Sequence, residues 1–228
     1  MANNQPNDKQ IVEDYFNAVG FDRWSKIYSD TDQISKLQRD IREGHQRTID
    51  LVLFWLKSIP NLAQLTICDA GCGVGSLSFP LAQMGAKVFA SDISTKMIAE
   101  AKQRLGSADN PQFQVQDLES LTGDYDVMIC LDVLIHYPLD QALAMLTHLA
   151  SLTHDRLIIS FAPKNLFYDL LKKIGDSFSG ANKATRAYLH SEKVFKQHLT
   201  NLGFTLLRQE FVASQFYFAT VYYAQKQR

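Results

Sequence analysis

Between residues 65 and 162, short β-rich apolar runs alternate with stretches of helical periodicity. The apolar runs are LTICDA, KVFAS, FQVQ, YDVMICLDV and RLIISFA, and helical stretches begin near Val74, near Thr95 and after Pro138. Strands and helices that alternate in this way fold into a parallel sheet with helices on both of its faces. This alternation constrains the fold more than any other feature, and it predicts an α/β protein.

The two ends of the chain depart from this pattern. Apolar residues at helical spacing predict a helix over residues 8–18 and a longer one over 33–59, with Thr31 or Asp32 as the N-cap of the second and residues 20–28 as the connection. At the other end, GFTLLRQEFV and SQFYFATVYYAQ are two β-rich runs with almost nothing between them, which indicates an antiparallel hairpin. An open α/β sheet that ends in such a hairpin is not the usual dehydrogenase pattern.

Charge and cysteine content exclude several classes of function. The chain has 23 basic and 24 acidic residues, so no net charge attracts it to a phosphate backbone, and nucleic acid is not an expected partner. Cys68, Cys72 and Cys130 are too few for a disulfide framework and have no zinc-ligand spacing, so we expect buried free thiols. The polar start lacks a signal sequence and no apolar run is long enough to span a membrane, which predicts a cytoplasmic protein.

The sequence DAGCGVG, residues 69–75, follows the first predicted strand and precedes helix-forming sequence. Glycines at alternate positions, Gly71, Gly73 and Gly75, let the backbone turn sharply and approach a ligand closely at the start of a helix. A tight turn without a ligand is the alternative interpretation.

Two acidic residues favour a ligand with a nucleoside part. Asp92 ends the second apolar run, where its carboxylate could accept hydrogen bonds from both ribose hydroxyls. Asp117 follows the third run at the same edge of the sheet and could accept from an adenine amino group. Either acid alone could be a helix cap, but together with the glycine loop they predict a nucleoside site.

The spacing within the loop separates two nucleoside cofactors. A pyrophosphate prefers G-x-G-x-x-G at an uncharged helix start, whereas this chain has G-x-G-x-G preceded by Asp69. The Asp69 carboxylate would repel a pyrophosphate but would attract a sulfonium compound with a positively charged amino-acid tail. The expected cofactor is therefore S-adenosylmethionine.

This loop resembles motif I of the class I S-adenosylmethionine-dependent methyltransferases, Asp92 and Asp117 match the next two motifs, and YDVMICLDVL matches the fourth. The resemblance covers about residues 64–224. It implies a Rossmann-like fold with a mostly parallel seven-stranded sheet and a C-terminal antiparallel hairpin, preceded here by an N-terminal helical arm. The cofactor-binding residues that it implies are Asp69, Ala70, Gly71, Cys72, Gly73, Gly75, Asp92, Ile93, Asp117, Leu118 and Leu131.

Segments outside this shared core resemble one family more closely. VEDYFNAVGFDRWSKIY, IREGHQRTID, DAGCGVGSLSFPLA and LDVLIHYP are together similar to the magnesium-protoporphyrin IX methyltransferases of chlorophyll and bacteriochlorophyll synthesis. The resemblance implies transfer of a methyl group to a propionate carboxylate of magnesium-protoporphyrin IX, the one at ring C13 in this family, with S-adenosylhomocysteine as the second product. Magnesium would arrive inside the porphyrin, so no metal site on the protein is expected.

The resemblance implies that residues 1–60 form an arm that covers the substrate and that residues 61–228 form the S-adenosylmethionine-binding domain. A lid-like insertion is expected at residues 163–190 of this domain. A propionate is already ionised at neutral pH, so no strong base is needed. Catalysis would come from orienting the reactants and removing water, and orientation can contribute up to about 7–11 kcal/mol. Tyr28 and His136 lie in segments that match the family and are the suspected catalytic residues, although either could simply pack in place.

The predicted lid has side chains suited to a flat apolar substrate with acidic tails. Its cations are Lys164, Lys172, Lys173, Lys183 and Arg186, and its apolar residues are Phe161, Leu166, Phe167, Tyr168 and Phe178. A solvated helix is the alternative for this segment. An apolar face of the arm or lid would also suit peripheral contact with photosynthetic membranes, and the family leaves open a contact with a magnesium chelatase subunit.

Two other functions fit the same cofactor loop. One is a class I methyltransferase that acts on a different small molecule, such as a quinone. The other is a nucleotide-binding regulatory module without catalysis, which the set of Asp69, Asp92 and Asp117 disfavours.

Overall fold

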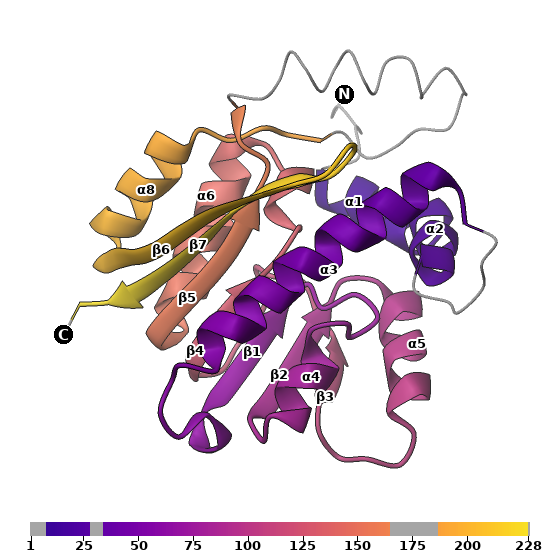
Figure 1. Ribbon diagram of the computed structural model, residues 1–228, viewed down its shortest axis with the longest axis horizontal. Helices are drawn as coiled ribbons and strands as arrows, with labels where there is room; N and C mark the ends of the chain where they lie inside the picture. The colour runs from indigo at the N-terminus through magenta and orange to yellow at the C-terminus, as the bar shows by residue number, and fades with distance from the viewer. Residues whose placement is uncertain (1–7, 28–33, 165–186, 228) are drawn as a thin grey trace, which may run out of the picture.

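The computed structural model describes residues 8–27, 34–164 and 187–227. One sheet contains seven strands in the order β3-β2-β1-β4-β5-β7-β6 (Figure 1). The strands are β1 (Thr66–Ala70), β2 (Lys87–Asp92), β3 (Gln112–Val115), β4 (Tyr125–Cys130), β5 (Thr153–Phe161), β6 (Phe204–Ala213) and β7 (Phe218–Lys226). Strands β1 to β5 pair in parallel, and β7 pairs antiparallel with both β5 and β6. The predicted class I methyltransferase architecture is therefore confirmed.

Helices cover both faces of this sheet, as the alternation of strands and helices predicts (Figure 1). They are α1 (Asp8–Phe16), α2 (Val19–Ile27), α3 (Lys36–Leu56), α4 (Ser78–Gln83), α5 (Thr95–Leu105), α6 (Leu139–Ser151) and α8 (Glu192–Asn201), with 3-10 turns η1 (Leu62–Gln64) and η2 (Leu134–His136). Within the described ranges, none of the helices has the length and apolar character needed to cross a membrane.

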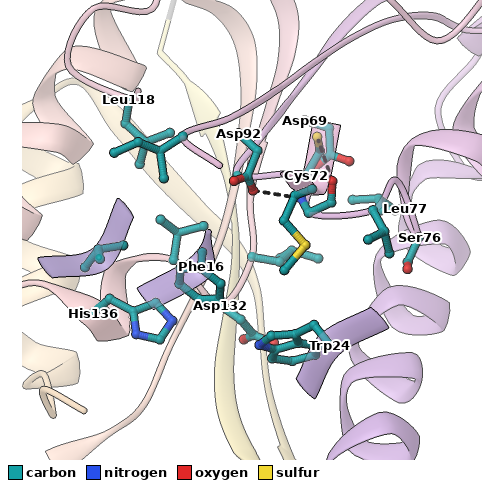
Figure 2. Close-up of a pocket in the computed structure, with 18 of the residues that line it drawn as sticks. Phe16, Trp24, Asp69, Cys72, Ser76, Leu77, Asp92, Leu118, Asp132 and His136 are labelled. Atoms are coloured by element: carbon teal, nitrogen blue, oxygen red, sulfur yellow. Dashed lines mark hydrogen bonds between the residues drawn. The ribbon is translucent and has the colours of Figure 1, made fainter. Parts of the chain in front are cut away.

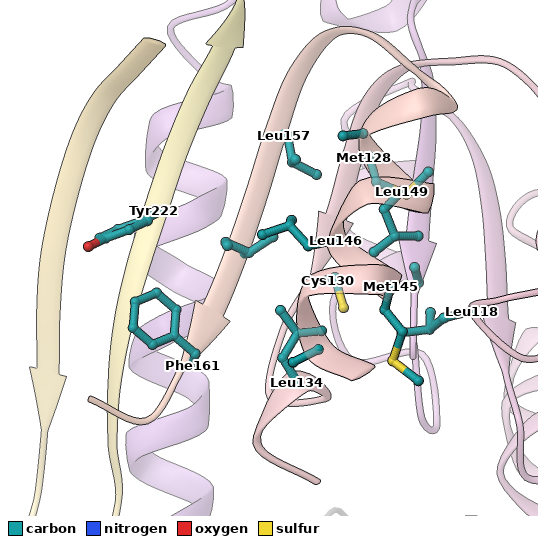
Figure 3. Packing of buried hydrophobic residues seen from close by; sticks show 14 of the residues in the cluster. Leu118, Met128, Cys130, Leu134, Met145, Leu146, Leu149, Leu157, Phe161 and Tyr222 are labelled. Atoms are coloured by element: carbon teal, nitrogen blue, oxygen red, sulfur yellow. The ribbon is translucent and has the colours of Figure 1, made fainter. Parts of the chain in front are cut away.

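The core divides into layers because successive residues of a strand point to opposite faces. Met128 and Cys130 of β4 pack with α6 on one face (Figure 3), while Val127 and Ile129 pack with α3 on the other. Cys68, Cys72 and Cys130 are buried free thiols, as predicted.

Phe161 belongs to this core, which corrects its assignment to the porphyrin-facing lid. Its ring is 1% exposed and lies 4.4 Å from the ring of Phe195 (centroid to centroid), with Tyr222 at 5.0 Å. Lys164 is exposed, and the other lid residues predicted to contact the substrate lie outside the described residues.

Two predictions about the N-terminal helices are wrong. Residues predicted as a connection form α2 instead, and Gly20 serves there as a packing residue, because an added Cβ would lie 2.8 Å from the backbone oxygen of Tyr15. The N-cap of α3 is Ser35 rather than Thr31 or Asp32. The Ser35 hydroxyl accepts from the Gln38 amide at 3.2 Å and the Gln38 side chain accepts from the Ser35 amide at 2.9 Å, which makes a complete capping box.

Strand β4 ends at Cys130, three residues before the predicted end at Val133. Asp132 has a φ of +57°, in the left-handed region, so the extended strand cannot continue through it. Similarly, α4 begins at Ser78 rather than near Val74, since Gly75 has a φ of +86°.

Candidate active site

A pocket lies at the carboxyl ends of β1, β2 and β4 and is bordered by the N-terminal helices (Figure 2). Ligands of open α/β sheets bind at this edge. From the arm, the lining includes Val12, Phe16, Trp24, His45 and Ile49. From the loops and strand ends, it includes Asp69, Gly71, Cys72, Gly73, Val74, Ser76, Leu77, Asp92, Ile93, Met97, Gln116, Asp117, Leu118, Leu131, Asp132, Val133, His136 and Tyr137.

Backbone hydrogen bonds hold the glycine loop against the end of β2. The amides of Gly71 and Cys72 both donate to the carbonyl of Ser91, at 2.7 and 2.9 Å. The Gly73 amide donates to Oδ2 of Asp92 at 2.9 Å. A pyrophosphate-binding loop offers its amides to the ligand, whereas here three successive amides are already paired within the protein. The loop therefore does not suit a dinucleotide.

Two glycines give this loop its shape. Gly71 has a φ of +84°, and an added Cβ would overlap a methyl group of Val133. Gly73 has a φ of +53°, and an added Cβ would meet no atom within 4 Å. The backbone at Gly73 is thus open toward the pocket, where a ligand can approach it closely.

Asp69 is a buried acid in the wall of the pocket, with an exposed fraction of 3%. The Ser78 hydroxyl donates to its carboxylate at 2.6 Å. Burial raises the pKa of Asp69 to about 6, against the opposing effects of Ser78 and of the charge on His45. A buried carboxylate of this kind is stabilised by a cationic ligand, so the residues present fit a sulfonium compound with an amino group.

Asp92 accepts from the amides of Gly73 and Ser94, the latter at 2.8 Å. Burial raises its pKa, although both hydrogen bonds oppose the change. Each carboxylate oxygen can accept a second hydrogen bond, so Asp92 keeps acceptor capacity for two ribose hydroxyls.

Asp117 is joined to the arm by an ion pair that the sequence did not indicate. The Lys9 ammonium of α1 lies 2.7 Å from its Oδ2. Burial favours a raised pKa for Asp117, but the hydrogen bonds from Lys9 and Ser120 outweigh burial and lower it. The carboxylate therefore stays ionised.

Nine of the eleven predicted cofactor-binding residues line this one pocket: Asp69, Gly71, Cys72, Gly73, Asp92, Ile93, Asp117, Leu118 and Leu131. The other two, Ala70 and Gly75, do not line it. Ala70 is fully buried in β1, and Gly75 lies against Phe79 and Phe113, where an added Cβ would come within 2.9 Å of both rings. Their binding roles stay predictions.

His136 lies in η2 and lines the pocket, with its ring 5.1 Å from that of Phe16 in an edge-to-face contact (Figure 2). Burial lowers its pKa to about 4, against the opposing charge of Asp132, so the imidazole is neutral at physiological pH. A neutral imidazole can donate one hydrogen bond and accept another. Tyr28, the other suspected catalytic residue, lies outside the described residues.

Sequence reasoning missed a polar centre around Asp132. Its carboxylate contacts His45 Nδ1 at 2.7 Å, the Tyr217 hydroxyl at 2.8 Å and the Ser160 hydroxyl at 2.7 Å. Burial favours a raised pKa for Asp132, but its contacts, chiefly with His45, lower it. His45 lies within the segment IREGHQRTID, and Asp132 lies two residues after the end of β4, but nothing in the sequence linked either of them to Tyr217.

Comparison with protein families matches residues 130–226 to the family described as magnesium-protoporphyrin IX methyltransferase C-terminus and residues 67–155 to a methyltransferase domain. The chain is 52% identical over 216 residues to magnesium protoporphyrin IX methyltransferase, chloroplastic, of Arabidopsis thaliana, which covers 93% of this chain and 69% of the relative. It is also 52% identical over 225 residues to the magnesium-protoporphyrin O-methyltransferase of Synechocystis, which covers 97% of each chain.

A solved structure resembles this chain over nearly its whole length. It is the crystal structure of magnesium protoporphyrin IX methyltransferase (ChlM) from Synechocystis PCC 6803 with bound SAH. The TM-score is 0.88 at 52% identity, over 96% of this chain and 100% of that chain.

Proposed function

Since this chain belongs to the magnesium-protoporphyrin IX methyltransferase family, we infer that it transfers a methyl group from S-adenosylmethionine to a propionate carboxylate of magnesium-protoporphyrin IX. The products are the monomethyl ester, an intermediate of chlorophyll biosynthesis, and S-adenosylhomocysteine. The observation that carries this inference is the 52% identity to a magnesium-protoporphyrin O-methyltransferase over 97% of both chains. A quinone or another small molecule as acceptor has no comparable support.

Three acidic residues and one glycine are proposed to bind S-adenosylmethionine. When bound, S-adenosylmethionine supplies an electrophilic methyl group. Asp92 would hold the ribose hydroxyls and Asp117 the adenine, while the backbone of Gly73 allows close approach. Asp69 would offset the positive charge of the cofactor, because its buried carboxylate has no cation of its own in contact among the described residues.

The acceptor needs orientation rather than activation, because its propionate is already an anion at neutral pH. His136 is the described residue best suited to this role, since its neutral imidazole can donate a hydrogen bond to the propionate without forming a tight ion pair. Phe16 and Trp24 supply apolar surface on the arm side of the pocket. Together they would exclude water from the carboxylate and raise its reactivity. Tyr28 is proposed as a second orienting group on its resemblance alone.

The arm's role as substrate cover and the boundary near residue 60 are part of this proposal. The aromatic residues that α1 and α2 place in the pocket support them. We also propose peripheral attachment to photosynthetic membranes and contact with a magnesium chelatase subunit. Their support is the exposed side chains of Ile11 and Val19 on the arm, which are 44% and 46% exposed.

Purified protein incubated with S-adenosylmethionine and magnesium-protoporphyrin IX should form a monomethyl ester, measured by liquid chromatography and mass spectrometry. His136→Ala should lower kcat by about 100-fold, as loss of an orienting group does, with S-adenosylhomocysteine affinity within about twofold of wild type. His154→Ala is the matched control, because its side chain is 58% exposed and lies outside the pocket lining. Absence of ester with bound cofactor, or methyl transfer to a quinone instead, would overturn the proposed acceptor.

A further inference from the structure

Tyr137 directly follows His136 and lines the same pocket, but the proposed function gives it no role. Its side chain lies almost entirely inside the protein, with an exposed fraction of 4%. The ring belongs to the apolar cluster that also contains Val12 and Leu118, two other residues of the pocket lining. Tyr137 thus combines an apolar ring in the core with a hydroxyl at the wall of the pocket.

The backbone holds Tyr137 in one conformation. Its amide donates to the Leu134 carbonyl at 3.3 Å and so closes the η2 turn. The following residue, Pro138, restricts Tyr137 to extended dihedral angles, and the observed values are a φ of −124° and a ψ of 144°. Pro138 is also the N-cap of α6. The Tyr137 side chain therefore starts from a well-defined point at the pocket wall.

The Tyr137 hydroxyl makes no hydrogen bond within the part of the chain that the structure describes. Buried tyrosine hydroxyls usually have a partner, because an unpaired polar group in an apolar environment costs free energy. Tyr125 and Tyr222 are buried to a similar degree, and their hydroxyls donate to the carbonyls of Thr122 at 2.9 Å and Glu192 at 3.2 Å. Tyr137 differs from both, so its hydroxyl is available to a ligand in the pocket.

Tyr137 lies at the end of the pocket where Asp117 is proposed to bind adenine. Leu118, which follows Asp117, is in the same apolar cluster as the Tyr137 ring. Burial raises the pKa of the Tyr137 phenol above its ordinary value, and nearby negative charges, of which Glu119 is the largest contributor, raise it further. The hydroxyl therefore stays protonated at neutral pH and can donate a hydrogen bond.

Adenine has groups that the acids at this end of the pocket cannot bind. The ionised carboxylate of Asp117 can only accept hydrogen bonds, so it suits the amino group of adenine. The ring nitrogens of adenine are acceptors themselves and need a donor from the protein. Gln116 also lines the pocket, but its side-chain amide donates to the Ser120 carbonyl. The Tyr137 hydroxyl supplies an unpaired donor.

We propose that the Tyr137 hydroxyl donates a hydrogen bond to a ring nitrogen of the cofactor's adenine. Tyr137 is then a binding residue that contributes to selection of the purine, and it takes no part in methyl transfer itself. The inference rests on the proposed function only through its cofactor, S-adenosylmethionine, and does not depend on the methyl acceptor.

The test compares S-adenosylhomocysteine with its 1-deaza, 3-deaza and 7-deaza analogues, in each of which a C–H group replaces one ring nitrogen, by calorimetric titration. Wild type should bind the analogue that lacks the contacted nitrogen about 2- to 12-fold more weakly than S-adenosylhomocysteine, the range of one hydrogen bond between neutral groups. Tyr137→Phe should bind S-adenosylhomocysteine more weakly by a similar factor and lose the discrimination against that one analogue. The affinity ratios for the other two analogues should be the same in both proteins.

Tyr125→Phe is the matched control. Tyr125 is 6% exposed and lies outside the pocket lining, and its hydroxyl is bonded to the Thr122 carbonyl. This variant should lower the midpoint of urea denaturation, because it breaks a hydrogen bond, and should leave every affinity ratio unchanged. Tyr137→Phe removes a hydroxyl without a partner in the ligand-free protein, so its denaturation midpoint should equal that of wild type.

Two results would overturn the inference and leave the proposed function intact. One is a Tyr137→Phe variant that binds all four ligands more weakly by the same factor, which would show a purely structural role. The other is a variant with wild-type affinities, which would show that the hydroxyl does not contact the cofactor. A wild-type protein that does not bind S-adenosylhomocysteine would instead overturn both the inference and the proposed function.

Discussion

The glycine loop and the polar centre around Asp132 lie along the same edge of the sheet but are built in different ways. The loop is held by backbone amides that reach residues at most 20 positions away, such as Gly71 to Ser91. The polar centre is held by side chains, and Asp132 contacts residues 87 and 85 positions away, His45 and Tyr217. Backbone thus shapes the cofactor side of the pocket, and individual side chains shape the side toward the arm.

This difference predicts different tolerance to substitution. Most side chains of the loop can change without altering backbone hydrogen bonds, but a glycine with positive φ cannot gain a Cβ without strain. On the arm side, single side chains can be replaced while strands and helices persist, so changes there should alter ligand preference more than stability.

Gly71→Ala should be the most damaging single change to cofactor binding. An added Cβ would overlap Val133 and would stand on a backbone with a φ of +84°. Overpacking of this kind costs about 1–3 kcal/mol, and displacement of the loop should weaken S-adenosylhomocysteine binding by about 100-fold in calorimetric titration.

Gly203→Ala separates backbone strain from damage to the site. Gly203 has a nearly identical φ of +81°, and an added Cβ there would meet nothing within 4 Å. It should lower the free energy of unfolding by about 1–2 kcal/mol in denaturant titration and leave cofactor affinity unchanged. If both variants lost cofactor affinity equally, the loss in Gly71→Ala would come from backbone strain in general and not from displacement of the glycine loop.

The contrast between the backbone-held loop and the side-chain-held polar centre also explains which parts of the fold and site the sequence could predict. The alternation of strands and helices located β1 to β5 to within a few residues, and the hairpin signal located β6 and β7. The alternation also placed Asp92 and Asp117 at one edge, because parallel strands end together. Local rules failed where tertiary contacts decide: Gly20 suggested a turn, but its contact with Tyr15 makes it part of α2.

The polar centre could not be predicted for a related reason. Asp132 was assigned to a strand, since nothing in LDV signals a positive φ at a residue other than glycine. Tyr217 was assigned to a β-rich run, and only the docking of the hairpin tip on Asp40 and Gly44 brings it to Asp132. Such contacts depend on where helices pack, which periodicity does not specify.

Acidification should change the charge of Asp69 but not that of His136, because the two groups have different pKa values. Asp69 has a pKa of about 6 and must be ionised to attract the ammonium group of the ligand. Protonation below this value should weaken S-adenosylhomocysteine binding by about fourfold between pH 7.5 and 5.5, as follows from the fraction of ionised carboxylate. His136, with a pKa of about 4, stays neutral over this range and should not contribute.

Asp69→Asn keeps an acceptor for Ser78 and should give weaker binding that no longer changes with pH over this range. His136→Ala should retain the wild-type pH dependence. Unaltered pH dependence in Asp69→Asn would assign the titration to another group, of which buried Asp92 is the first to consider, since burial raises its pKa as well.

The ion pair between Lys9 and Asp117 should give the smallest effect, and it directly joins the arm to the cofactor side of the pocket. Its side chains are 32% and 22% exposed, and pairs of this kind contribute about 0.2–1 kcal/mol. Lys9→Met keeps the aliphatic length and should weaken S-adenosylhomocysteine binding by at most about fivefold at low salt and by less than twofold at about 1 M salt, where screening is strong. Lys102→Ala, in the last turn of α5 and outside the pocket lining, is the control. A loss as large as that of Gly71→Ala, independent of salt, would show that arm and loop form one cooperative unit, and the distinction between a backbone-built and a side-chain-built half would then fail.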